Sequence, residues 1–187
     1  MPVTPLHGLA FMFLYFRDKR RIDPLALIVS ATFIDLEPFY YFIIHEPLDH
    51  RIWHGFAASL TVYPILVMIG AFVVERFFEE ELFSAYNSLR LKPNQVRYSL
   101  SKIYLCSLVG GVSHVSLDMF THKDMPYVIY PLANGNPFYL GTASITVELA
   151  VILLVVYSCL RWWNERFSEA SKFEKRAESV ISHNREP

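Results

Sequence analysis

The sequence has little charge and almost no cysteine. Charged residues make up only 19% of its 187 residues, against about 25% in an ordinary soluble domain. The formal net charge of -1 leaves no basic face of the kind that binds nucleic-acid phosphates, so we expect no nucleic-acid partner. Both cysteines, Cys106 and Cys159, lie inside apolar runs. We expect two small buried side chains rather than a disulfide or thiolate ligands.

The sequence also lacks the motifs that define several enzyme and targeting classes. It shows no sustained period-two alternation, no Gly-rich phosphate loop, no internal repeat and no serine nucleophile elbow. The N-terminus has no basic segment ahead of an apolar run and no small-residue cleavage site, so we expect no cleavable signal peptide. By contrast, hydrophobic residues make up 53% of the chain, which points to a membrane protein.

Long apolar segments predict an all-α, multi-pass transmembrane helical bundle with about four spanning helices. The expected spans cover about residues 24–44, 52–74, 99–120 and 139–163. Before them we expect a short N-terminal helix over residues 5–16, which is too short to cross a bilayer. The predicted domains are a transmembrane bundle at residues 1–163 and a charged, helical, cytoplasmic tail at residues 164–187.

Local signals refine this prediction at three points. Asp23 followed by Pro24 is typical of a helix start, and Pro64 predicts a kink in the third helix. Gly110-Gly111 predicts that a neighbouring helix approaches closely. Residues 75–102 are polar and mixed in charge, which favours an extended loop with one interfacial helix.

Lysine and arginine predict the orientation of the bundle. If the basic segment at residues 17–21 lies on one side and each predicted span crosses, that side receives 15 of the 17 Lys and Arg residues. Only Arg51 and Lys123 fall on the other side. Because basic loops stay in the cytoplasm, we expect the first side to be cytoplasmic and the protein to reside in the cell membrane.

Histidines and carboxylates converge on the predicted outer side. Only His183 of the seven histidines falls on the cytoplasmic side, and the acids inside the predicted spans lie in their outer halves. His114, Asp118 and His122 follow one another at i, i+4 spacing, so one helical face presents imidazole, carboxylate and imidazole in a line. Charged groups within a span are costly and usually functional, and a divalent cation would neutralise them.

Plainer explanations apply to some of these residues. Asp35 and Glu37 are also compatible with capping or bridging helices near the interface, and His45 and His50 with solvated loop positions. His50 and His54 are four residues apart and would both face inward if the third helix began early. Glu148, deep in the last predicted span, either orients a ligand histidine or bonds a neighbouring helix.

Four short motifs occur in an order that resembles a known family. They are Met1-Pro2-Val3-Thr4-Pro5-Leu6-His7, Phe33-Ile34-Asp35-Leu36-Glu37-Pro38, Trp53-His54-Gly55-Phe56, and Ser113-His114-Val115-Ser116-Leu117-Asp118 leading to Thr121-His122. Together, over about residues 1–140, they resemble the membrane-bound predicted metal-dependent hydrolases, a group thought to be distantly related to zinc-dependent phospholipase C and P1 nuclease. The resemblance implies the metal ligands His7, Asp35, His54, His114 and Asp118, with His122 and Glu37 as additions.

These observations lead to a hypothesis of metal-dependent hydrolysis. One or two divalent ions, zinc above all, would generate hydroxide at neutral pH and clamp a phosphoester. Glu37 would act as general base and Glu148 would support a ligand histidine. A site at the outer membrane interface favours a lipid or lipid-linked substrate. The alternatives are a divalent-cation transporter or metal-handling protein, and a non-catalytic scaffold with a structural metal.

Overall fold

The computed structural model of the chain describes residues 5–46 and 50–183. Across those residues the regular structure is entirely helical, which confirms the all-α prediction. The elements are α1 (Pro5–Ala10), α2 (Met12–Arg17), α3 (Pro24–Thr32), η1 (Phe33–Asp35), α4 (Leu36–Ile43), η2 (Ile52–His54), α5 (Phe56–Leu60), α6 (Val62–Phe77), α7 (Glu79–Ser88), α8 (Leu100–Thr121), η3 (Gly141–Ala143) and α9 (Ser144–His183).

Three helical stretches are long and apolar enough to cross a membrane. They are Pro24–Ile43, Leu100–Thr121 and Gly141–Glu165, within the part of the chain that the structure describes. They agree with three of the four predicted spans, and the chain is therefore consistent with a membrane protein. The first combines α3, η1 and α4, so a short 3₁₀ turn interrupts it near Asp35.

The remaining predicted span, residues 52–74, is not one continuous helix. It is divided into η2, α5 and the 16-residue α6, and the interruption lies at Thr61 instead of forming a kink at Pro64. Proline has no N–H for the carbonyl four residues earlier and its ring collides with that carbonyl. The carbonyl concerned belongs to Leu60, where α5 ends. α6 also continues past the expected end, so that Glu75 is a buried helical residue and not part of a loop.

The predicted start of the first span is confirmed. The Asp23 carboxylate accepts a hydrogen bond from the Leu25 N–H at 2.9 Å, and Pro24 occupies the first turn of α3. Asp23 is fully buried. Its side chain therefore satisfies one of the N–H groups that a helix leaves unpaired at its start.

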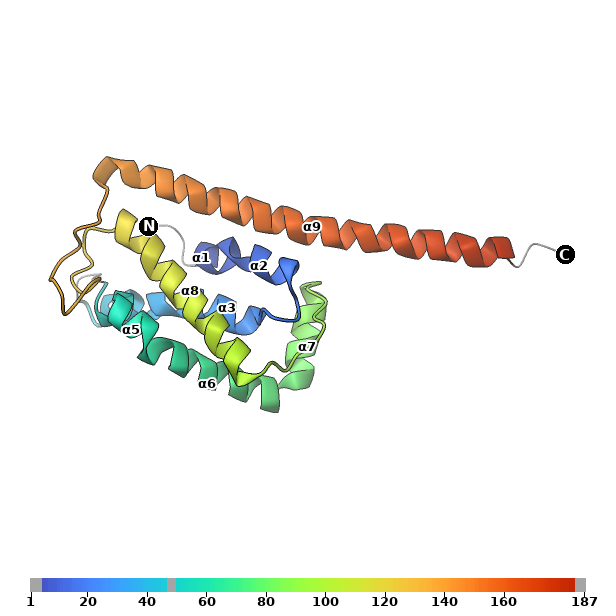
Figure 1. Cartoon of the computed structure of the whole chain (residues 1–187), viewed down its shortest axis with the longest axis horizontal. Helices are drawn as coiled ribbons and strands as arrows, with labels where there is room; N and C mark the ends of the chain where they lie inside the picture. Colours follow the sequence, from blue (N-terminus) through green and yellow to red (C-terminus); the bar gives the residue numbers. More distant parts are fainter. Residues whose placement is uncertain (1–4, 47–49, 184–187) are drawn as a thin grey trace.

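Helix α3 lies at the centre of the bundle. It packs against α8, α6 and α1, while α9 runs along the outside against α1 and α2 (Figure 1). A Cβ atom added to Gly110 of α8 would lie 1.9 Å from Ser30 Oγ of α3, which confirms the predicted close approach. Glycine is therefore required for the two backbones to meet at this distance.

The first part of α9, up to residue 165, is mostly exposed on the surface of the bundle. Only 11% of its most apolar stretch is buried inside the protein, as expected for a helix that faces lipid on most sides. The prediction that both cysteines are buried is correct for Cys106 and wrong for Cys159, which is exposed on α9. The apolar residues around Cys159 suit a lipid environment and do not require a protein one.

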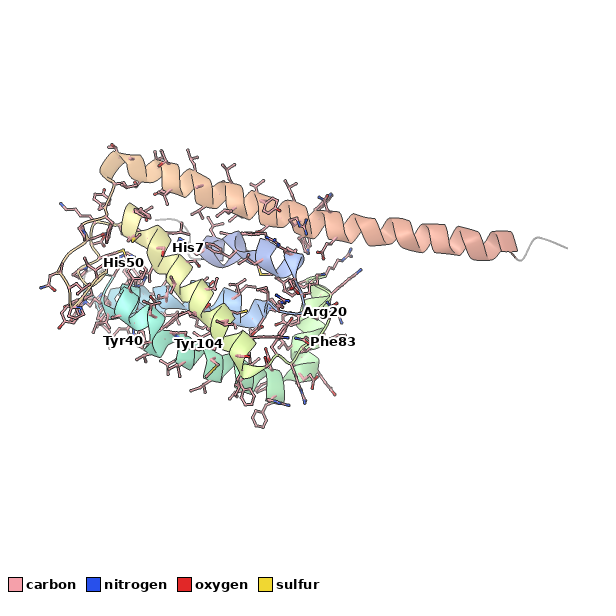
Figure 2. The ribbon with its side chains drawn as sticks, in the orientation of Figure 1. His7, Arg20, Tyr40, His50, Phe83 and Tyr104 are labelled. Carbon is pink, nitrogen blue, oxygen red and sulfur yellow. The ribbon has the colours of Figure 1, made fainter. Side chains whose placement is uncertain are left out.

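Basic residues and histidines gather at opposite ends of the bundle. Figure 2 shows His7 and His50 at one end and Arg20 at the other. At the basic end, the Lys19 amino group donates to the Leu91 carbonyl, and the Lys102 amino group donates to the Arg20 carbonyl. These bonds join the segment after α2 to residues 91–102. The bundle therefore has one basic end and one histidine-rich end.

Candidate metal centre

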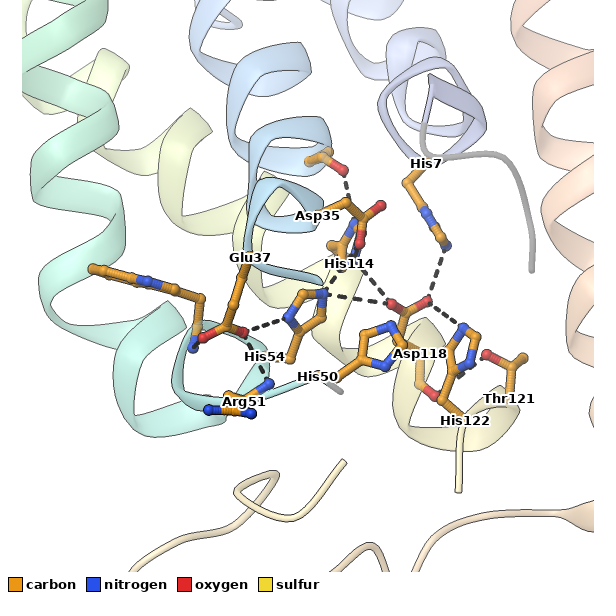
Figure 3. Close-up of polar contacts among 12 residues, drawn as sticks. His7, Asp35, Glu37, His50, Arg51, His54, His114, Asp118, Thr121 and His122 are labelled. Atoms are coloured by element: carbon orange, nitrogen blue, oxygen red, sulfur yellow. Dashed lines mark hydrogen bonds and ion pairs between the residues drawn. The ribbon is translucent and has the colours of Figure 1, made fainter. Parts of the chain in front are cut away.

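The histidine-rich end brings together five side chains from four separate segments of the chain. His7 comes from α1, Asp35 from η1, and His54 from η2, and α8 contributes His114 and Asp118 (Figure 3). All of these except Asp35 are almost fully buried, with at most 2% of the residue exposed. The structure thus gathers the whole ligand set that the sequence predicted around one carboxylate, that of Asp118.

Helix α8 supplies the predicted line of imidazole, carboxylate and imidazole. His114 Nε2 lies 3.0 Å from Asp118 Oδ2, and His122 Nε2 lies 3.9 Å from Asp118 Oδ1. α8 ends at Thr121, so His122 is the first residue after the helix and has an extended backbone. The i, i+4 spacing nevertheless keeps all three side chains on one side of α8.

Asp35 faces two histidines at once. Its Oδ1 atom lies 3.1 Å from His54 Nε2 and 3.2 Å from His114 Nε2. The 3₁₀ turn that ends at Asp35 sets this direction by tightening the helix between α3 and α4. The ligand atoms of Asp35, His54, His114 and Asp118 all lie within 4.8 Å of one another, so that they could hold one metal ion.

The Nδ1 atoms of two of these histidines donate hydrogen bonds to oxygens other than those of Asp35 and Asp118. His114 Nδ1 lies 2.8 Å from the Ala31 carbonyl, and His54 Nδ1 lies 3.0 Å from Glu37 Oε2. Because both partners can only accept, each Nδ1 carries a proton, and Nε2 is the nitrogen that faces the carboxylates of Asp35 and Asp118. A metal ion bound at this place would replace any proton held between Nε2 and these carboxylates. The Nδ1 contacts are the usual support of histidine ligands.

A second group of ligand atoms lies on the other side of Asp118. The ligand atoms of His50, Asp118 and His122 also lie within 4.8 Å of one another, and His7 Nε2 lies 3.4 Å from Asp118 Oδ1. Asp118 Oδ2 faces the first group and Oδ1 faces this one. Asp118 is therefore placed to bridge two ions.

Several buried nitrogen and oxygen atoms that could bind a metal ion in the two groups form no hydrogen bond among the described residues. They are His7 Nδ1 and Nε2, His50 Nδ1, His114 Nε2 and Asp118 Oδ1. Leaving such atoms buried and unpaired is costly, and native proteins rarely do so. The donor set, all imidazole nitrogen and carboxylate oxygen, is one that zinc and similar divalent ions accept. The residues therefore fit a metal centre.

Burial keeps two of the histidines neutral. Desolvation, together with the neighbouring imidazoles, lowers the pKa of His7 and of His50 to about 4. Both rings are then uncharged at neutral pH and have a lone pair available for a metal ion. His54 differs: burial opposes its charge, but the hydrogen bonds that its ring donates to the Asp35 and Glu37 carboxylates outweigh burial and raise its pKa.

The cluster opens to its surroundings at two side chains. The Asp35 side chain is 15% exposed and that of His122 is 14% exposed, while His54 and His114 are completely buried. A structural zinc site normally has every coordination position closed by protein. Each of the two groups of ligand atoms therefore has one partly exposed member.

Glu37 has contacts that differ from those of a free base. Its Oε2 atom accepts from the Arg51 N–H and from His54, and its Oε1 atom accepts from the Trp53 N–H. Both oxygens are thus engaged, and the carboxylate holds η2 and His54 in place. The predicted general-base role for Glu37 finds no support in this geometry, because the carboxylate is occupied with positioning His54.

Glu148 and His45 lie apart from the cluster. Glu148 is half-buried in α9, and within the described part of the chain no hydrogen bond or ion pair joins it to the cluster. The support of a ligand histidine that was predicted for Glu148 is provided by Glu37. His45 is exposed after the end of α4.

His50 lies in the cluster although it was not among the ligands predicted from the sequence. It is 3% exposed, and its ring centroid lies 4.5 Å from those of both His54 and His122. No helix connects His50 to His54, since only the 3₁₀ turn η2 lies there. The four-residue spacing between them was the available signal, although it acts here through a loop.

Comparisons with known proteins assign a family without an activity. A family model described as a domain of unknown function (DUF4184) matches residues 1–181, which is nearly the whole chain. No curated protein matches, and no solved structure matches.

Proposed function

We propose that this chain, which belongs to the DUF4184 family, is a membrane-embedded, metal-dependent hydrolase of a phosphoester. The substrate is a lipid or lipid-linked compound that is cleaved at the outer membrane interface. The observation that carries the proposal is the position of Asp118 between two groups of ligand atoms. The resemblance of the four motifs to membrane-bound metal-dependent hydrolases supports the same conclusion.

Two bridged ions have a defined chemical use. When bound, such ions lower the pKa of water to about 7 and stabilise both oxygens of a phosphoryl transfer. The protein holds His54 and His114 in one orientation through Glu37 and the Ala31 carbonyl. Asp35 is a partly exposed ligand, and both of its contacts to the histidines use Oδ1.

The position of the centre in the bundle supports a lipid-type substrate. The histidine-rich end lies opposite the basic end (Figure 2), and basic segments favour the cytoplasm. The metal centre then lies at the outer face, at the depth of lipid head groups. Aromatic residues gather near this end, as they do at membrane interfaces, and Tyr40, Tyr41 and Trp53 are among them.

Catalysis agrees with the structure better than transport or a structural metal does. A transporter needs ionisable groups along its path, whereas between Asp35 and the basic end α3 buries Ala26, Leu27 and Ala31, with Ser30 as the one polar side chain among its buried residues. A structural site is expected to be closed, whereas Asp35 and His122 are partly exposed.

Metal content of the detergent-purified protein tests the proposal. We expect one or two equivalents of zinc, measured by plasma mass spectrometry, and hydrolysis of phosphoester substrates that depends on this metal. His114→Ala/Asp118→Ala should remove the metal and the activity. His45→Ala, an exposed histidine outside the cluster, should change neither. If the unmodified protein takes up no metal when metal is offered at neutral pH, the proposal is wrong.

A further inference from the structure

A large apolar groove runs along the bundle between α3–α4 and α6. Its volume is about 690 Å³, within the range of pockets that hold small-molecule ligands. Most of its walls are aliphatic or aromatic. The lining residues that matter here are Leu25, Val29, Leu66, Val67, Gly70 and Val74.

The groove is apolar along its length and polar at one end only. Glu37 is the one charged residue in its lining, and Tyr41 and Trp53 lie at the same end. The guanidinium of Arg51 stacks 3.8 Å from the centre of the Tyr41 ring. The same guanidinium pairs with the Glu46 carboxylate at 2.6 Å, so this end of the apolar groove has a polar rim of one cation and two acids, which suits a lipid head group above an acyl chain.

Glu37 connects this groove to the metal centre. The residue lines the groove, while its carboxylate bonds the N–H groups of Arg51 and Trp53 and the ring of His54. The polar end of the groove and the ligand His54 therefore share one side chain. A molecule seated in the groove would have its polar end beside the cluster.

The length of the groove matches one leaflet of a bilayer. It extends along the first membrane-spanning stretch from Leu25 to Glu37. Twelve helical residues rise about 18 Å, and one leaflet contributes about half of the ~30 Å hydrocarbon core. An acyl chain that starts at the outer interface would lie along the groove to its far end.

We propose that this groove binds the acyl chain of an anionic, phosphate-bearing lipid and presents its head group to the metal centre. The inference rests on the proposed function for the identity of the head group. The binding of the acyl chain is inferred from the lining and length of the groove. The two parts are therefore tested by separate measurements.

Gly70 offers a way to fill the groove without disturbing the core. A Cβ atom added at Gly70 would meet nothing within 4 Å, so Gly70→Phe has room to place its ring in the groove. Leu66→Phe, at another half-exposed lining residue, fills it independently and adds no tryptophan. Ile69→Phe is the matched control, because Ile69 is exposed on α6 and lies outside the groove lining.

Fluorescence of Trp53 measures occupancy directly. In a Trp162→Phe/Trp163→Phe background, Trp53 is the remaining tryptophan. The probe is a lysophosphatidic acid with a brominated 16-carbon chain, added to protein in a non-brominated maltoside detergent. We expect saturable quenching, weakened at least tenfold in Gly70→Phe and Leu66→Phe and unchanged in Ile69→Phe. Equal metal content and elution volume confirm that each variant is folded.

The outcomes separate the inference from the proposed function. Quenching that is not saturable, that a brominated maltoside reproduces, or that survives both filling variants overturns the acyl-chain groove. If quenching behaves as expected but the zinc-loaded protein cleaves no phosphoester, the groove stands and the hydrolase proposal fails. If both hold, Gly70→Phe should lose hydrolysis of long-chain substrates and keep that of a short, water-soluble phosphoester.

Discussion

The contacts of His54 illustrate how one ligand depends on residues that bind no metal. Its Nδ1 proton goes to Glu37, and Glu37 is itself held by the N–H groups of Arg51 and Trp53. Three donors thus converge on one carboxylate. The orientation of the ligand nitrogen follows from this set of hydrogen bonds.

Replacing Glu37 with glutamine should therefore weaken the metal centre without removing a ligand. An amide has one acceptor oxygen, and its NH₂ group would face a donor. We expect Glu37→Gln to lower zinc affinity by about 10–100-fold, measured by competition with a chelator of known affinity. Glu46→Gln, an exposed acid that contacts Arg51, should leave the affinity unchanged. Equal affinities of Glu37→Gln and the unmodified protein would contradict the positioning role.

At the other end of the bundle, Asp23 makes stability depend on pH. Burial raises the pKa of Asp23 to about 6, above the value of about 4 in an unfolded chain. A group whose pKa is raised by folding contributes stability below its unfolded pKa and loses it as the pH rises through its folded pKa. The contribution of Asp23 should therefore be lost between about pH 4 and pH 6, and the neighbouring buried Glu75, whose pKa is raised to about 8 by burial and by Asp23, should extend the loss of stability to about pH 8.

Asp23→Asn tests this pH dependence. Asparagine caps a helix as well as aspartate does, so the bond from the Leu25 N–H is retained while the buried charge is removed. We expect the variant to melt at the same temperature as the unmodified protein near pH 4. At pH 7 it should melt several degrees higher, since each kcal/mol shifts the midpoint by roughly 2–4 °C. A constant difference across this pH range would show that Asp23 does not carry the effect.

Residue-level predictions succeeded where the relevant neighbours were close in sequence. The line from His114 through Asp118 to His122 follows from helical spacing alone. The role of Glu37 in holding His54 across 17 residues does not. It depends on how η2 folds back on α4, which no local pattern in the sequence specifies.

Among the helices, the contact between α3 and α8 determines the geometry of the metal centre. Asp35 follows the end of α3 and His114 belongs to α8, so the distance between the two helices sets the distance between these ligands. The closest approach is at Gly110, four residues before His114.

Gly110→Ala should therefore reduce stability and metal affinity together. The added Cβ atom would lie 1.9 Å from Ser30 Oγ, and such overpacking costs roughly 1–3 kcal/mol. Pushing α3 from α8 would also separate Asp35 from His114. We expect a lower melting temperature in detergent and weaker zinc binding by chelator competition. Gly70→Ala, where a Cβ atom meets nothing within 4 Å, is the matched control, and a similar loss in both variants would contradict this explanation.

The sequence predicted where the long helices occur better than it predicted where they are interrupted. The composition of residues 24–44, 99–120 and 139–163 indicated spans that the structure contains. The 3₁₀ turn before Asp35 and the break at Thr61 were not predicted. The 3₁₀ turn accompanies the direction of Asp35 towards His54. The break at Thr61 follows from the missing N–H of Pro64.

For the whole molecule, the opposite placement of basic residues and histidines is the main organising feature. The sequence indicated it through the distribution of Lys and Arg, and the structure gathers the two kinds of residue at separate ends (Figure 2). Which end faces the cytoplasm is a prediction from charge alone. It determines where a lipid-type substrate would meet the metal centre.

Cysteine accessibility in intact cells tests this orientation. Asn134 is exposed in the loop between α8 and η3 at the histidine-rich end, and Asn87 is exposed on α7 at the basic end. In a Cys106→Ala/Cys159→Ala background, a membrane-impermeant maleimide should label Asn134→Cys in intact cells and Asn87→Cys only after the cells are opened. The reverse pattern would place the metal centre in the cytoplasm and exclude an outer-leaflet substrate. Labelling of both positions in intact cells would mean that α8, the helix that lies between them in the chain, does not carry the chain across the membrane.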